Sequence, residues 1–283
     1  MKKSILIKLI VFLLIFPFTT SNAQDNFTIP YGNNKSVGKY AKVNGTKIYY
    51  EQYGKGEPLF IIHSCGTDIK AMEYQIDFFK KKYNVIAVDS RGQGKSKLKT
   101  TNLTYDLMAK DYEALANYLK LDAINILGWS DGAIIGLKMG INNKIKIKKI
   151  IAMGPNLRLD STAVNNWAIK QVQEMHSQTI KMLKNGDTSK NWEKELQLDK
   201  LLLNSSEITH KALKKITAEV LVIIGDRDII KNQHAVEIFD NISKAQLCIL
   251  PGANHGIPRN NSEMFNTISH HFLTQKFDYS NDK

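Results

Sequence analysis

Cysteine is scarce in this sequence: Cys65 and Cys248 are the two among 283 residues. Neither belongs to a CxxC pair, and neither has the cysteine–histidine spacing of a zinc site, so no metal centre is predicted. Both cysteines lie in or directly after apolar, strand-like runs, where buried free thiols are common. An exported protein could instead pair them in a disulfide, so the residues alone leave both states open.

Long apolar runs are also missing after residue 23, and no later stretch is long enough to cross a bilayer. Residues 1–23 begin with Lys2 and Lys3, are almost wholly apolar from 5 to 18, and end in Ser21-Asn22-Ala23, a cleavage-like site. This pattern predicts a secretory signal peptide and hence a periplasmic or extracellular protein. A retained N-terminal anchor is the alternative, although the run is short for a spanning helix. After signal removal, no stable membrane insertion is expected.

The sequence has no arginine cluster interleaved with aromatic residues, no internal repeat and no low-complexity segment. It contains 39 basic and 27 acidic residues, and removal of residues 1–23 takes away three lysines, which leaves a net charge of +9. The lysines are scattered, which indicates a solvated basic surface and argues against a nucleic-acid partner. Weak attraction to anionic cell surfaces is compatible with this charge. The oligomeric state is not indicated.

The remaining chain of 260 residues is long enough for one large domain, and its apolar runs alternate with helical patterns. Strands are expected at 40–43, 46–53, 58–64, 84–89, 123–127, 148–153, 220–224 and 246–250. Helices are expected at 68–82, at 104–120 with Thr104 as a possible N-cap, from 133 onwards, at 233–242 and at 262–275. Such alternation indicates an α/β fold: a mostly parallel sheet with helices on both faces.

Residues 156–215 interrupt this alternation, because they contain helical patterns and no strand pattern. We interpret them as a helical lid between a first core part, 24–155, and a second, 216–283. The lid would cover the carboxyl ends of the strands, where open α/β sheets bind ligands. Its apolar stripe includes Trp167 and two methionines. We expect most of the stripe to be ordinary core, with a few side chains facing a substrate.

The motif Gly128-Trp129-Ser130-Asp131-Gly132 stands between a predicted strand and a predicted helix. In that context G-x-S-x-G is a nucleophile elbow, which holds a serine on a strained turn at the top of the sheet. Gly128 and Gly132 would let the strand and helix pass close together. The motif alone arises by chance in some chains, so the flanking elements carry the interpretation. Ser130 is therefore the candidate nucleophile.

A nucleophilic serine needs a base, an acid that orients the base, and donors for the oxyanion. His255 follows the last predicted strand in a loop flanked by glycines, whereas most other histidines lie in helical patterns. Asp228 follows the strand at 220–224, with Asp226 as its rival, and the chain order serine, aspartate, histidine is that of α/β hydrolases. The oxyanion donors would be the backbone N–H groups of Asp131, directly after the nucleophile, and of Cys65.

Together these motifs resemble the α/β-hydrolase superfamily of lidded serine esterases, peptidases and acyltransferase-like enzymes. The resemblance rests on five motifs between residues 60 and 256: His63-Ser64-Cys65-Gly66, 89–96, 128–132, Gly225-Asp226-Arg227-Asp228 and 251–256. The family usually has His-Gly where this chain has His63-Ser64. The resemblance implies Asp228 as the acid and a structural role for His63. It also implies a sheet order that holds Cys65 and Cys248 too far apart for a disulfide.

The predicted function is an exported serine hydrolase that cleaves an ester or related acyl bond of a small molecule, without a cofactor. A serine nucleophile argues against the dehalogenase and epoxide-hydrolase branches. Aminopeptidase, lactonase, carbon–carbon hydrolase and perhydrolase activities share the same triad and stay open. A protein of this fold that binds a ligand without catalysis is a further alternative, although such a binder need not retain all three groups.

Overall fold

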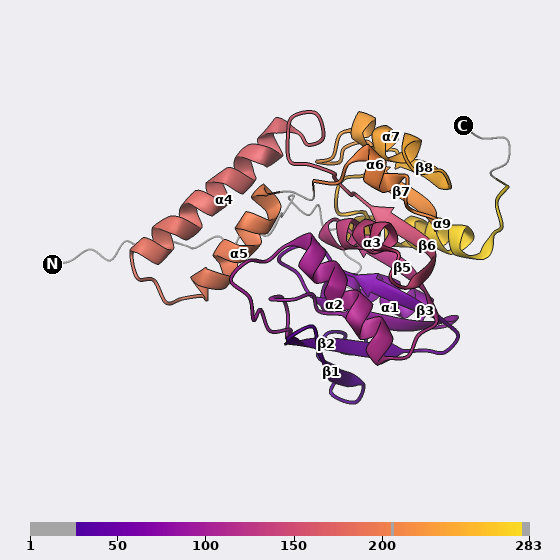
Figure 1. Ribbon diagram of the computed structural model, residues 1–283, viewed down its shortest axis with the longest axis horizontal. Coiled ribbons are helices and arrows are strands. Elements are labelled where there is room, and N and C mark those ends of the chain that lie inside the picture. Colours follow the sequence, from indigo (N-terminus) through magenta and orange to yellow (C-terminus); the bar gives the residue numbers. More distant parts are fainter. Residues whose placement is uncertain (1–26, 205–206, 279–283) are drawn as a thin grey trace.

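The computed structural model describes residues 27–204 and 207–278, so the predicted signal peptide, residues 1–23, lies outside the described part. A single sheet of eight strands runs through these residues, in the order β1-β2-β4-β3-β5-β6-β7-β8 (Figure 1). The first two strands are antiparallel to their neighbours, and all other pairs are parallel. The strands are β1 (Gly38–Val43), β2 (Thr46–Tyr53), β3 (Glu57–Ile62), β4 (Tyr83–Val88), β5 (Ala123–Trp129), β6 (Lys146–Met153), β7 (Glu219–Gly225) and β8 (Ala245–Leu250).

Helices cover both faces of this sheet, and each face has its own apolar core. One face carries α2 (Tyr105–Tyr118), α3 (Asp131–Asn142) and α7 (Asn232–Asp240). The other carries η1 (Ile69–Met72), α1 (Glu73–Phe79), α8 (Ile257–Asn260) and α9 (Ser262–Thr274). The strand interiors are buried because both faces are covered, which explains why they read as continuous apolar runs. The predicted α/β fold is therefore confirmed.

Between β6 and β7 the chain forms α4 (Asn166–Lys184), α5 (Trp192–Leu203) and α6 (His210–Leu213). Helices α4 and α5 pack together as a hairpin that stands apart from the sheet, and we call this hairpin the cap (Figure 1). The amide of Gln197 on α5 connects the cap to the core through Leu103 N, at 2.9 Å, and through the carbonyl of Thr101, at 2.6 Å.

The apolar stripe of the cap is only partly core. Val172 and Thr179 on α4 are buried, and Met175 and Met182 are half-buried. Trp167 is 51% exposed, so the expectation that it belongs to the core was wrong. It lies in the first turn of α4.

The cysteines are both free thiols in this structure. Cys65 follows β3, and Cys248 lies on β8, four positions away in the sheet order. At about 4.8 Å per strand the two positions are about 19 Å apart, far beyond the reach of a disulfide. Within the described ranges, no helix has the length and apolarity to span a bilayer, and no group of three or more metal-ligating side chains is found.

Candidate active site

Ser130 lies in the tight turn between β5 and α3, with φ 55° and ψ −112°. This left-handed backbone is strained for a residue with a side chain, as expected of a nucleophile elbow. A Cβ on Gly128 would lie 2.2 Å from the carbonyl oxygen of Gly132, and one on Gly132 would lie 2.2 Å from that of Ile62. Both positions therefore require glycine, as predicted, because strand and helix pass at backbone contact.

The structure brings together the three side chains predicted as a triad. His255 Nε2 lies 2.9 Å from Ser130 Oγ, and His255 Nδ1 lies 2.7 Å from Asp228 Oδ1. His255 and Asp228 are buried, whereas Ser130 is half-buried. With Nδ1–H donating to the carboxylate, Nε2 is free to accept the serine hydroxyl proton. The rival acid, Asp226, points elsewhere and accepts the N–H of Gly252 at 2.8 Å.

Two residues that the sequence analysis did not single out hold His255 in place. The indole N–H of Trp129 donates to the backbone carbonyl of His255 at 2.8 Å. Gly154, at the end of β6 with φ +63°, lies so close to the imidazole that a Cβ there would be 2.6 Å from Cε1. Trp129 stands at a variable position of the elbow motif, so the motif did not indicate a role for it. Gly154 belongs to no motif, and its place directly after a predicted strand was the only signal for it in the sequence.

The loop after β3 supplies the second predicted oxyanion donor. The backbone N–H groups of Cys65 and Asp131 donate to no acceptor among the described residues, and Asp131 is the first residue of α3, where helix N–H groups are unpaired. His63 shapes this loop: its Nε2 accepts the N–H of Ser90 at 2.9 Å, and its Nδ1 lies 2.7 Å from the Ser64 carbonyl oxygen. Ser64 has no left-handed φ, so the loop does not need glycine there.

Comparison with known proteins agrees with this geometry. Residues 57–186 match the family model of the alpha/beta hydrolase fold. The serine hydrolase BPHL of Homo sapiens is 25% identical over 260 residues, which cover 86% of this chain and 88% of that protein. An esterase from Exiguobacterium antarcticum superposes with a TM-score of 0.72 at 24% identity, and covers 84% of this chain and all of its own.

The chain has the alpha/beta hydrolase fold, and these comparisons confirm its predicted resemblance to that superfamily. The enol-lactonase from Burkholderia xenovorans shares the fold as well, with a TM-score of 0.70 and 20% identity over 84% of this chain and 100% of that one. Several of the matched relatives are named as hydrolases, with different substrates, and this supports a hydrolase role.

A second carboxylate belongs to Asp131, the residue that directly follows the nucleophile. The Asp131 side chain is buried, at 2% exposure, and its Oδ1 accepts the hydroxyl of Tyr105 at 2.9 Å. Burial raises the pKa of Asp131 to about 6, while Tyr105, Cys65 and His255 act in the opposite direction. The Cys65 thiol is a weak hydrogen-bond donor to the same carboxylate, and Oδ2 has no other partner among the described residues. A buried carboxylate that lacks one partner is costly unless something else binds it.

The thiol of Cys65 lies between this carboxylate and the cap. Burial raises the pKa of Cys65 well above its ordinary value, and the nearby charges that add to this effect include Asp131, Asp199 and Glu195. The last two lie one turn apart on α5. The thiol is therefore influenced by carboxylates of the core and of the cap, although Glu195 is itself paired with Lys194 at 3.3 Å.

Proposed function

We propose that this α/β hydrolase is a serine hydrolase that cleaves an ester or related acyl bond through an acyl-enzyme on Ser130. The observation that supports the proposal is the continuous hydrogen-bonded chain from Ser130 through His255 to Asp228, at 2.9 and 2.7 Å. Because the serine stands on a strained turn at the end of β5, its hydroxyl can approach a carbonyl carbon.

In the first half of the reaction, Ser130 Oγ forms a bond to the acyl carbon while its proton passes to His255 Nε2. Asp228 stabilises the resulting imidazolium. The N–H groups of Cys65 and Asp131 stabilise the negative charge on the carbonyl oxygen. When the tetrahedral intermediate collapses, the bond to the leaving group breaks, and His255 donates its proton to that group.

In the second half, water takes the place of the leaving group. His255 removes one proton from the water, and the water oxygen forms a bond to the acyl carbon. The ester bond to Ser130 then breaks. The proton returns from His255 to Ser130 Oγ, so the free acid leaves and the enzyme regains its starting state.

The buried carboxylate of Asp131 favours a particular kind of acyl compound within this class. Asp131 directly follows the nucleophile, and within the described part of the chain its Oδ2 has no partner stronger than the weak thiol donor Cys65. A cationic group close to the acyl carbon would give this carboxylate a stronger partner. We therefore propose that amine-bearing acyl esters or amides are better substrates than neutral ones. Lactones and carbon–carbon bonds stay as alternatives with the same triad.

A substrate panel tests both parts of the proposal. It contains acyl p-nitrophenyl esters of graded chain length, the matching esters with an α-amino group, aminoacyl amides and lactones. Turnover of at least one class that is lost in Ser130→Ala supports the serine hydrolase, and higher kcat/KM for the amine-bearing member of each pair supports the acidic site. If the wild-type protein turns over no member of the panel, the result would favour the alternative of a protein that binds a ligand without catalysis.

We also propose that the protein is exported and that residues 1–23 are removed. The support is the sequence pattern of those residues, two lysines, an apolar run and a small residue at a cleavage position. N-terminal sequencing of protein from the periplasm or medium should begin at Gln24. Recovery of the whole protein from the cytoplasm with Met1–Ala23 intact would contradict export.

A further inference from the structure

The segment that leads into the cap runs antiparallel beside the segment that carries the acid. We call residues 157–165 the cap-entry segment and residues 228–237 the acid segment; the second spans Asp228 and most of α7. Contacts occur at successive positions along both: Leu157 N to His234 Nε2, Arg158 to Glu237, Ala163 O to Lys231 N, Val164 to Ile230 in a bridge, and Asn165 to Ile229 and Asp228.

One end of this pairing lies on the catalytic acid. The Asn165 side-chain amide donates to the backbone carbonyl of Asp228 at 3.0 Å, and the Asn165 N–H donates to that of Ile229 at 2.9 Å. The side chain of Asp228 turns back over the same turn, since its Oδ1 accepts both the N–H of Ile230, at 2.9 Å, and His255. A shift of this backbone would therefore move Oδ1 relative to the imidazole.

Asn165 holds the N-cap position of α4 but does not cap it. Asparagine is among the preferred N-cap residues because its side-chain oxygen accepts an N–H of the first turn. Here the side chain makes no such hydrogen bond, and its amide donates to Asp228 instead. The first residue of the cap is thus used to hold the acid. The two paired segments and the first turn of α4 also share an apolar cluster, which consists of Ala163, Val164, Ala168 and Ile230.

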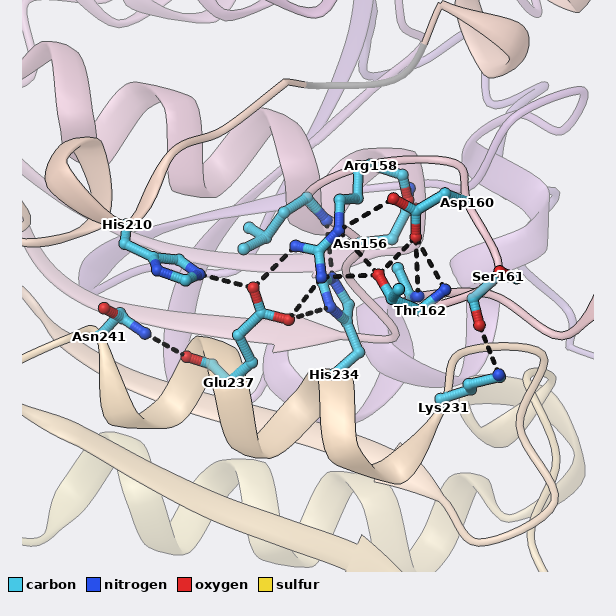
Figure 2. A network of polar contacts seen from close by, with 12 residues as sticks. Asn156, Arg158, Asp160, Ser161, Thr162, His210, Lys231, His234, Glu237 and Asn241 are labelled. Carbon is cyan, nitrogen blue, oxygen red and sulfur yellow. Dashed lines mark hydrogen bonds and ion pairs between the residues drawn. The ribbon is translucent and has the colours of Figure 1, made fainter.

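The other end of the pairing is fixed by Glu237 on α7 (Figure 2). Its carboxylate accepts two hydrogen bonds from Arg158, at 2.7 and 2.9 Å, and contacts His234 Nδ1 at 2.8 Å. It also contacts His210 Nε2 at 2.6 Å, where the chain leaves the cap and enters α6. One side chain of the core thus binds both the entry and the exit of the cap, so the cap-entry segment is held between Glu237 and Asp228.

We propose that Asn165 is a positioning residue for Asp228, and that through it the seating of the cap sets the alignment of the catalytic acid. This inference rests on the proposed serine-hydrolase function. When the cap is seated, Asn165 holds the carbonyl of Asp228, and Oδ1 stays within hydrogen-bond distance of His255 Nδ1. When the cap moves away, that support is lost, and the imidazole loses its orienting partner.

The test compares three variants: Asn165→Ala, Asn165→Asp and, as a matched control, Asn166→Ala, which alters the exposed neighbouring residue. Asn165→Ala should lower kcat for p-nitrophenyl acetate roughly fivefold to twentyfold, as expected for one lost hydrogen bond at the reacting groups, with KM within about twofold. The rate of covalent labelling by a fluorophosphonate should fall by the same factor, while Asn166→Ala matches the wild type.

Asn165→Asp separates positioning from helix stability. An aspartate can cap α4 and complements the helix dipole, so the Tm should be unchanged or higher. It cannot donate to the Asp228 carbonyl, so kcat should fall as in Asn165→Ala. The downfield proton resonance of the His255–Asp228 hydrogen bond should shift or broaden in both variants.

The outcomes distinguish this inference from the function on which it rests. Absence of fluorophosphonate labelling in the wild type would overturn the serine hydrolase itself. Full labelling of the wild type, together with equal kcat in all three variants, would overturn the positioning role of Asn165. A loss of activity in Asn165→Ala that Asn165→Asp restores would assign Asn165 to helix capping and would also overturn it.

Discussion

Gly154 shows how closely the residues around His255 are fitted. A methyl group at this position would lie 2.6 Å from Cε1 and 2.9 Å from Nδ1 of the imidazole, so the ring must move away from Asp228. Gly154→Ala should therefore lower kcat at least about tenfold, because the hydrogen bond that orients the base is lost. Steady-state kinetics with an activated ester measures this loss.

The control is Gly186→Ala, in the loop after α4. Gly186 has φ +66°, nearly the φ of Gly154, but nothing lies within 4 Å of its added Cβ. Both variants strain the backbone equally, and only Gly154→Ala displaces the ring. Equal activity in the two variants would show that Gly154 is not needed for the position of His255.

The ionised Asp131 carboxylate is expected to lower the stability of the fold while it binds an amine-bearing substrate. Its folded-state pKa of about 6 lies above the ordinary value, so the folded protein binds this proton more tightly than the unfolded chain. Its contribution is therefore fully favourable only below about pH 4 and is lost as the pH rises through 6. Asp131→Asn should raise the free energy of unfolding at pH 8, by roughly 1–3 kcal/mol, and change it little at pH 4. Thermal melts at the two pH values measure the difference.

The same variant tests the acidic site. Asp131→Asn should reduce the preference for amine-bearing over neutral esters by roughly tenfold or more, because it removes the charge that pairs with the ammonium group. A variant with an unchanged preference would exclude Asp131 as the group that recognises the amine.

The two carboxylates after β7 have different partners, so their amide variants should differ. Asp228 Oδ1 contacts the imidazole, and Asp228→Asn should cut turnover severely, by up to about 10⁴, with little change in Tm. Asp226 accepts a turn N–H from Gly252, and Asp226→Asn should mainly lower stability, by about 1 kcal/mol. Kinetics and melts of both variants are the measurement, and the reverse pattern would assign the acid to Asp226.

Among single residues, the sequence predicts those whose chemistry has a local signature. Ser130 lies in a motif that demands a strand and a helix around it, and His255 and Asp228 each follow an apolar strand. Gly154 and Asn165 have no such signature, because their importance comes from atoms far along the chain that only folding brings near. A glycine after a strand or an asparagine before a helix has ordinary structural explanations.

Among the elements, Glu237 on α7 is the side chain that joins the cap to the core. Hydrogen bonds from Arg158 are the largest cause that lowers its pKa to about 2. A depressed pKa means that its stabilising contribution is complete above about pH 4.5 and is lost as the pH falls toward 2. Glu237→Gln should therefore lower the free energy of unfolding at pH 7 by about 1 kcal/mol, with a corresponding fall in Tm, and have less effect near pH 3.

Glu174→Gln is the matched control, since Glu174 lies on exposed α4 and forms a single ion pair with Lys170 at 3.8 Å. Exposed pairs of this kind contribute little, so its Tm should stay near that of the wild type. Melts across pH 3–7 make the comparison. A loss of stability in Glu237→Gln that is the same at every pH would contradict the charged network of Figure 2.

Element types were easier to predict than element ends. All eight expected strands occur, because buried strands keep continuous apolar runs. The helix expected over 68–82 is shorter and starts as the 3-10 helix η1, since Asp68 caps that turn through Lys70 N. The short α8 had no periodicity to reveal it. Trp167 was misassigned because helical spacing does not say where along α4 the partner helix ends.

For the whole molecule, alternating strands and helices were enough to predict a parallel sheet, but the order of the strands was not. Strand β3 lies between β4 and β5, and this crossover is set by long-range packing rather than by any local pattern. The parallel direction of β5, β7 and β8 brings their carboxyl ends to one edge of the sheet, and the strand order sets how far apart these ends lie along it. There the nucleophile, acid and base meet, although 125 residues separate Ser130 from His255.

The proposed chemistry requires Ser130 to be an activated nucleophile in an assembled triad. The most direct measurement is intact-mass and peptide mapping of the protein after reaction with a fluorophosphonate. One covalent adduct per chain, located on Ser130, should form in the wild type and be absent from Ser130→Ala, whose fold stays intact. An adduct on another residue, or an unreactive wild type, would show that Ser130 is not the nucleophile of an assembled triad.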